Sequence, residues 1–194
     1  YPGAFVVFDQ IKTAEVGSKK AFLLHAQQRP TIEGNTITLL NTEEGYSGKL
    51  VNQILYVGTA DAADPYYKIL RLGGENKQYW YDGKNHPNTS SVADNMGYEP
   101  GWGRVEITTT ANNANQTDYM LNVMYVGDAD GSTEVVPSTM IRGDGIMGAQ
   151  VFNHVAMFNM NGNTRIGSTI TFTIPASADY SKFKVNVAGM KAGT

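Results

Sequence analysis

The stretch Ile170-Thr171-Phe172-Thr173-Ile174 places an apolar residue at every second position. Because successive side chains of a β-strand point to opposite faces, the three apolar residues share one face and the two threonines share the other. This pattern is typical of a strand with one face in a core and one face in water. An amphipathic helix would instead repeat its apolar residues every three or four positions.

Similar segments rich in Val, Ile, Thr, Phe and Tyr recur at short intervals, with turn residues such as Gly, Asn and Asp between them. No segment keeps a helical period. The sequence therefore predicts an all-β protein, an antiparallel two-sheet β-sandwich in which residues 1–194 form a single domain. The expected strands are residues 4–8, 21–25, 35–40, 53–57, 66–72, 78–81, 103–109, 119–126, 151–159, 168–174 and 183–187.

Composition narrows the classes of partner. Of the 194 residues, 41% are hydrophobic and 17% are charged, which suits a globular protein with a real core. The net charge is −3 and the basic residues are scattered, so no basic stripe exists for nucleic acid. No apolar run approaches the roughly 20 residues that span a bilayer, so no membrane partner is expected. The absence of cysteine excludes disulfides and thiolate sites, and we expect no cofactor.

Three short motifs fit turns better than ligand sites. Gly143-Asp-Gly-Ile-Met-Gly148 has the spacing of a dinucleotide-binding loop, but the strand-like residues 151–158 follow where such a loop needs a helix. Arg142-Gly-Asp144 spells an integrin-type tripeptide, which any exposed turn with glycine can spell by chance. Asp128-Ala-Asp-Gly131 resembles the start of a calcium loop whose glycine comes too early. We therefore reject a nucleotide-binding role for the first motif and interpret the other two as turns or hairpins.

The three histidines show no metal-ligand spacing, and we expect no metal site. His25 ends an apolar strand and His154 shares a strand face with two phenylalanines, so both are interpreted as structural core residues. His86 differs, because it lies in a turn-rich segment beside aromatic residues, where an exposed imidazole is available to a ligand.

Aromatic residues provide the best candidate binding surface. Trp80, Tyr81, His86 and Trp102 are the predicted substrate-binding residues, because the C–H face of a sugar stacks on a flat ring while hydroxyl and imidazole groups hydrogen-bond. Alternation along a strand buries one of each adjacent pair, so at least one of the two tryptophans is expected in the core. Residues 86–100 are the best candidate for a long loop. No residue is assigned a catalytic role.

The order of several segments resembles a known family, and together they span nearly the whole chain. They resemble the C-terminal β region of heparinase II/III-like polysaccharide lyases, with one departure at Gln10, where that family is expected to have Arg. The segments are Phe5-Val-Val-Phe-Asp9, Lys19-Lys-Ala-Phe-Leu-Leu-His25, Pro30-Thr-Ile-Glu-Gly-Asn35, Gly48-Lys-Leu50, Gly73-Gly-Glu-Asn-Lys-Gln-Tyr-Trp-Tyr-Asp-Gly-Lys-Asn85, Trp102-Gly-Arg-Val-Glu106 and Asp118-Tyr-Met-Leu-Asn-Val-Met124.

The resemblance implies a longer parent enzyme, secreted or periplasmic in a bacterium, that cleaves uronate-containing acidic polysaccharides by β-elimination. Its catalytic Asn or His, Tyr and His residues, and any metal ligands, lie before the Phe-Val-Val-Phe-Asp strand and map to no position here. The expected partners are therefore an N-terminal helical toroid domain of the same protein and, through the parent enzyme, the acidic polysaccharide. Residues 1–194 alone are expected to be inactive.

Two other interpretations remain open. A free-standing carbohydrate-binding or cell-surface interaction module would use the same exposed aromatic residues without any chemistry. A small lyase that is active by itself is the third.

Overall fold

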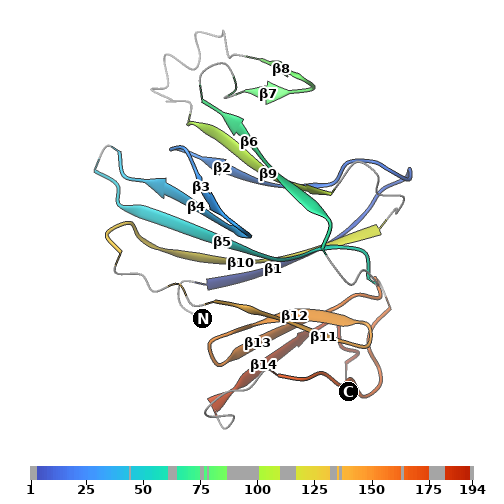
Figure 1. Ribbon diagram of the computed structural model, residues 1–194. Helices are drawn as coiled ribbons and strands as arrows, with labels where there is room; N and C mark the ends of the chain where they lie inside the picture. Colours follow the sequence, from blue (N-terminus) through green and yellow to red (C-terminus); the bar gives the residue numbers. More distant parts are fainter. Residues whose placement is uncertain are drawn as a thin grey trace.

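The computed structural model describes residues 4–43, 45–60, 65–74, 77, 79–86, 101–109, 117–131, 135, 137–162, 164–174 and 182–192. Within these ranges the chain is all-β and its strands form stacked sheets, so the predicted β-sandwich class is confirmed. Figure 1 shows that the stack has three layers, one more than a two-sheet sandwich.

The middle layer is a five-stranded antiparallel sheet in the order β1-β10-β5-β4-β3. Its two long strands, β5 and β10, are buried over most of their length on both faces. A strand buried on both faces has no polar side, which explains the near-continuous apolar runs in these segments. The strands of this sheet are β1 (Ala4–Lys12), β3 (Thr31–Glu33), β4 (Thr36–Asn41), β5 (Gly48–Gly58) and β10 (Thr117–Asp128).

A three-stranded antiparallel sheet covers one face of the middle layer. It has the order β2-β9-β6 and comprises β2 (Ala21–Ala26), β6 (Tyr67–Gly73) and β9 (Gly103–Thr109). The core between these two sheets is aliphatic, with Ile37, Val57, Val105, Ile107 and Met120 all fully buried. The opposite face of the three-stranded sheet points away from this core.

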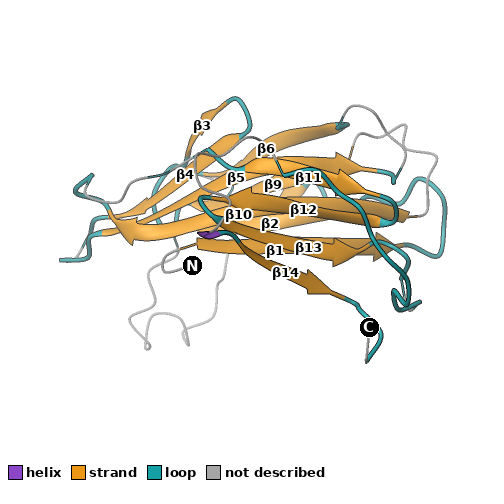
Figure 2. Cartoon of the chain, turned by 90° about the horizontal axis from the view of Figure 1, so that it is seen from below, coloured by secondary structure: helices purple, strands orange, loops and turns teal. Residues whose placement is uncertain are grey.

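A four-stranded sheet covers the other face of the middle layer, in the order β11-β12-β13-β14. Its strands are β11 (Thr139–Gly143), β12 (Ile146–Val151), β13 (His154–Asn159) and β14 (Lys184–Ala188). The β13–β14 pair is parallel, unlike the antiparallel pairs that the sequence led us to expect. Seen from below, the strands of the stacked sheets run in the same general direction, as in aligned sandwich packing (Figure 2).

Residues 170–174 pack as their alternation predicts but do not form a strand ladder. Ile170, Phe172 and Ile174 are half-buried against a third apolar cluster on the four-stranded sheet, while Thr171 and Thr173 are exposed. Only Phe172 makes a strand bridge, to Gly143. The period-two pattern therefore predicted the buried face correctly and the backbone pairing incorrectly.

Residues 151–159 contain a turn where the sequence led us to expect one strand. Val151 pairs with His154, and Phe152 adopts a positive φ of 53° in the two-residue hairpin between them. His154 is consequently half-buried at the start of β13, next to Lys184 on β14. It is not a member of the apolar clusters on either side of the four-stranded sheet, so its predicted place in the core is wrong. Burial and the charge of Lys184 lower the pKa of His154.

The three short motifs lie at turns or strand ends. The glycine-rich motif is a β-hairpin, with Asp144 and Gly145 as its two-residue turn between β11 and β12. Arg142 lies in β11 with its guanidinium 4.4 Å from the ring centre of Tyr56, so the tripeptide is not presented on an exposed loop. Asp128 ends β10 and the chain turns directly after it.

One buried ion pair connects two layers. Lys20, immediately before β2, places its Nζ 2.5 Å from Oδ2 of Asp118 in β10, and both side chains are almost completely shielded from solvent. The Tyr66 hydroxyl donates to the other carboxylate oxygen of Asp118. This contact joins the three-stranded sheet to the middle layer at the end of their shared apolar core.

Candidate functional site

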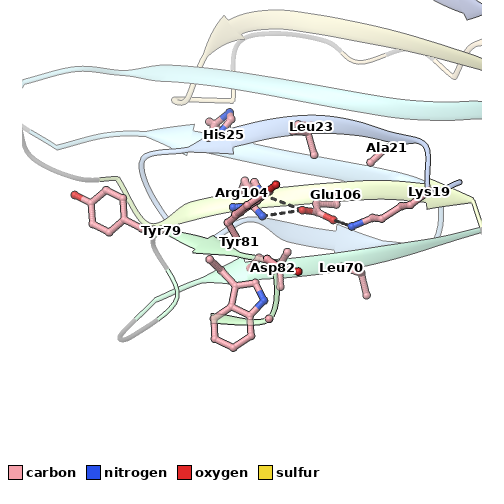
Figure 3. A pocket seen from close by; sticks show the side chains of 13 residues that line it. Lys19, Ala21, Leu23, His25, Leu70, Tyr79, Tyr81, Asp82, Arg104 and Glu106 are labelled. Atoms are coloured by element: carbon pink, nitrogen blue, oxygen red, sulfur yellow. Dashed lines mark hydrogen bonds and ion pairs between the residues drawn. The ribbon is translucent and has the colours of Figure 1, made fainter. Parts of the chain in front are cut away.

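A hollow on the outer face of the three-stranded sheet is the candidate site. It has a volume of about 720 Å³ and lies under a short hairpin formed by β7 (Trp80–Tyr81) and β8 (Lys84–Asn85). We call it the hairpin pocket (Figure 3). It is lined by Lys19, Ala21, Leu23, His25, Leu70, Leu72, Tyr79, Trp80, Tyr81, Asp82, Gly83, Arg104 and Glu106.

Strand register explains which side chains form the floor. His25 and Leu72 flank Arg104 on the neighbouring strands, and Leu23 and Leu70 flank Glu106 in the next outward-facing row. The residues between them along each strand, such as Val105, point into the core. The sheet therefore presents two charged groups on its central strand, with aliphatic side chains and one imidazole beside them.

The hairpin supplies the aromatic wall. Its turn is Asp82-Gly83, and both residues have positive φ, 48° and 75°, as a two-residue hairpin turn requires. The Tyr79 amide donates to the Asn85 side-chain oxygen at 3.1 Å, which closes the base of the hairpin. Tyr81 is 72% exposed, and its ring is therefore available to a ligand.

Glu106 organises the charge on the floor. Its carboxylate accepts from Nε of Arg104 at 3.0 Å and from Nη2 at 2.8 Å, and it also contacts Nζ of Lys19. Burial alone would raise the pKa of Glu106, but the hydrogen bonds and charges of Lys19 and Arg104 outweigh it, so the pKa lies below its ordinary value of 4.5. Glu106 thereby holds the Arg104 guanidinium in a fixed position on the floor (Figure 3).

The lowered pKa of Glu106 predicts a specific loss of stability in acid. A depressed folded-state pKa contributes stability above the unfolded value of 4.5, and this contribution disappears as the pH falls through the folded value. Glu106→Gln, which cannot ionise, should flatten the fall in the free energy of unfolding below pH 4.5 when denaturant curves are compared. An unchanged acid profile would show that the carboxylate is not stabilised by its two cationic neighbours.

The structure brings together two of the four predicted substrate-binding residues. Trp80 and Tyr81 both line the hairpin pocket. His86 is exposed beside them, with its ring centre 6.1 Å from that of Tyr81, but it does not line the pocket. Residues 87–100, the greater part of the predicted long loop, lie outside the described residues.

Trp102 lies elsewhere, and its role in the structure is packing. Its ring lies against the backbone of Gly73, where an added Cβ would come within 2.5 Å of Cε3, and it contacts the aliphatic core between the sheets. This agrees with the expectation that at least one tryptophan is a core residue. No contact places Trp102 in the hairpin pocket.

Three residues that were not predicted to bind substrate also line the pocket: His25, Arg104 and Glu106. His25 was expected in the core, yet its side chain is exposed, because Leu24 and Ala26 occupy the buried positions of β2. The expectation was wrong because β2 is apolar on both faces, so alternation did not indicate which face is buried. Arg104 and Glu106 do carry a signal, since they alternate with Val105 and Ile107.

Among the described residues, no group of three or more His, Cys, Asp or Glu side chains is arranged to hold a metal ion. The same residues include no helix with the length and hydropathy of a membrane span. No protein-family model matches the chain, and no curated protein is a significant match to it.

Proposed function

We propose that this chain is the non-catalytic β-sandwich part of a heparinase II/III-like polysaccharide lyase, and that it contacts the saccharide in the hairpin pocket. The observation that carries the saccharide contact is the pocket itself, where an aromatic wall faces a floor with a fixed arginine. The lyase assignment rests on the sequence resemblance. In this proposal the parent enzyme is secreted or periplasmic in a bacterium, and its helical toroid carries the β-elimination of uronate-containing polymers.

The chemistry of the pocket suits a sugar that carries a carboxylate. Aromatic rings pack against the apolar C–H face of a pyranose, and Arg is well suited to carboxylate recognition because its N–H groups form a planar fork. Arg104 uses Nε and Nη2 on Glu106, so Nη1 remains for a ligand. The pocket as a whole carries two cations, Lys19 and Arg104, and two carboxylates, Glu106 and Asp82, so recognition of a carboxylate rests on Nη1 of Arg104 and not on an excess of positive charge.

The lyase assignment has a direct test. The gene should encode a helical toroid with the Asn or His, Tyr and His residues upstream of Tyr1, and the complete protein should raise the ultraviolet absorbance of unsaturated uronates. Residues 1–194 alone should not. Absorbance produced by this chain alone would overturn the non-catalytic role, and an upstream region without a toroid would overturn the family assignment.

A free-standing carbohydrate-binding module is the second candidate, favoured by the exposed ring of Tyr81 with His86 beside it, which would hold a sugar without any chemistry. The two candidate functions differ in the protein region expected before Tyr1, whereas both use the hairpin pocket. Both candidates predict binding of oligosaccharides, and titration with matched acidic and neutral oligosaccharides distinguishes whether Arg104 selects a carboxylate.

Trp80→Ala is expected to weaken oligosaccharide binding about tenfold, because loss of one stacked ring costs about 1–1.5 kcal/mol. Calorimetric titration measures the change. Tyr46→Ala is the matched control, since Tyr46 is 63% exposed and does not line the pocket. Equal affinities of the two variants would exclude the hairpin pocket as the binding site.

A further inference from the structure

Lys20 and Asp118 are placed for a reaction with each other. We propose that their side chains condense to an amide, so that the mature chain carries an internal covalent cross-link between the three-stranded sheet and the middle sheet. The two groups lie 98 positions apart in the sequence, yet Nζ is 2.5 Å from Oδ2. The carboxyl carbon Cγ is therefore at most one C–O bond farther from the nitrogen.

Both reactants are held in place by neighbouring strands. The backbone carbonyl of Lys20 accepts from the Thr108 hydroxyl at 3.0 Å and from the Thr109 amide at 3.2 Å. Asp118 lies within the ladder of β10, and its Oδ1 accepts from the hydroxyl of Tyr66. Two groups fixed in contact react with a high effective concentration, because no further ordering is needed to bring them together.

Burial favours the condensation. The exposed fraction of the side chain is 1% for Lys20 and 0% for Asp118, and two ions are costly in such surroundings. Transfer of one proton from the ammonium to the carboxylate gives an amine and an acid, which burial penalises much less. These neutral forms are the ones that condense, and the shielded site limits the access of water for the reverse hydrolysis.

The reaction balances without any co-reactant. Nζ attacks Cγ and forms the N–C bond, while negative charge gathers on Oδ1, where the Tyr66 hydroxyl stabilises it as an oxyanion-hole donor does. A proton from Nζ moves to the protonated Oδ2, the Cγ–Oδ2 bond breaks, and one water leaves. Nothing is oxidised or reduced. Tyr66 is therefore a catalytic residue for this step, because its hydroxyl contacts the reacting carboxyl group directly.

A second lysine in the chain provides an internal comparison. Lys19 contacts Glu106 as closely as Lys20 contacts Asp118, but the Lys19 side chain is 57% exposed. A hydrated ammonium is not nucleophilic, so this pair should remain an ion pair. The proposal therefore predicts the loss of one water molecule and not two.

The test is the intact mass of the denatured full chain. It should lie about 18 Da, one water, below the mass of the sequence. Lys20→Arg and Asp118→Ala should restore the sequence mass of each variant, whereas Lys19→Met should still lose one water. Asp118→Asn should lose ammonia and give the same cross-linked product. A wild-type mass equal to that of the sequence would overturn the proposal and leave an ion pair.

Peptide mapping excludes the other source of the same mass change. Asp-Gly sequences also lose one water when they form succinimides, and the chain contains three, at Asp82, Asp130 and Asp144. The amide should instead block tryptic cleavage after Lys20 and yield a branched peptide that contains both Lys20 and Asp118. A linear peptide carrying the loss at an Asp-Gly pair would contradict the cross-link. Tyr66→Phe should increase the fraction of unlinked chains.

Discussion

Replacing Asp118 by alanine is expected to lower the free energy of unfolding by about 3–5 kcal/mol, because it removes the carboxylate that the buried amino group of Lys20 contacts. Lys20 cannot relax toward water without opening the contact between two sheets, since its side chain is only 1% exposed. If the amide is present, the variant loses the covalent link as well. Urea unfolding followed by tryptophan fluorescence measures the change, and intact mass identifies which form the wild type has.

Two variants make this result interpretable. Lys19→Met removes the exposed member of the Lys19–Glu106 ion pair and leaves Glu106 paired with Arg104, so it should cost no more than about 1 kcal/mol. The double variant Lys20→Met, Asp118→Leu replaces both buried groups with apolar ones and should recover much of the loss, because no charge is then left uncompensated. A single Asp118→Ala variant as stable as Lys19→Met would contradict the structural role of the pair.

The sequence predicted the strands better than their arrangement in layers. Alternation is a local property, so it identified the buried face of residues 170–174 even where no ladder forms. It did not predict the third layer, because a strand buried on two faces reads as a continuous apolar run whichever sheets cover it. Nor did it predict the parallel β13–β14 pair, since direction depends on how the chain returns and not on the residues of the strand.

The candidate site was predictable where its residues are neighbours in sequence. Trp80 and Tyr81 are adjacent in a hairpin marked by Asp82-Gly83, a turn signal that the sequence carries openly. Arg104 joins them only because β9 lies under that hairpin, a contact that requires the pairing of β6 with β9. The sequence shows that Arg104 and Glu106 share one face of β9, but it does not show that the β7–β8 hairpin covers this face.

Gly148→Val is expected to cost more than 3 kcal/mol, the second large effect that the structure predicts. Gly148 lies in β12, where an added Cβ would come within 2.8 Å of the carbonyl carbon of Ala156 and of the Cα of Met157, and closer still to the Ala156 oxygen. These are backbone atoms of the paired strand β13, so no side chain can rotate away. The two strands must separate, which breaks the ladder of the four-stranded sheet.

Gly48→Ala is the control for this prediction, because it adds a methyl group to a strand without crowding it. The nearest atom to a Cβ at Gly48 is the carbonyl oxygen of Asn41 at 3.8 Å, an ordinary contact. This variant should be neutral or up to about 1 kcal/mol more stable, since alanine restricts the unfolded chain. In the Gly148 variant, hydrogen exchange should accelerate first in β12 and β13, whereas uniform acceleration through β5 and β10 would show that the sheets unfold as one cooperative unit.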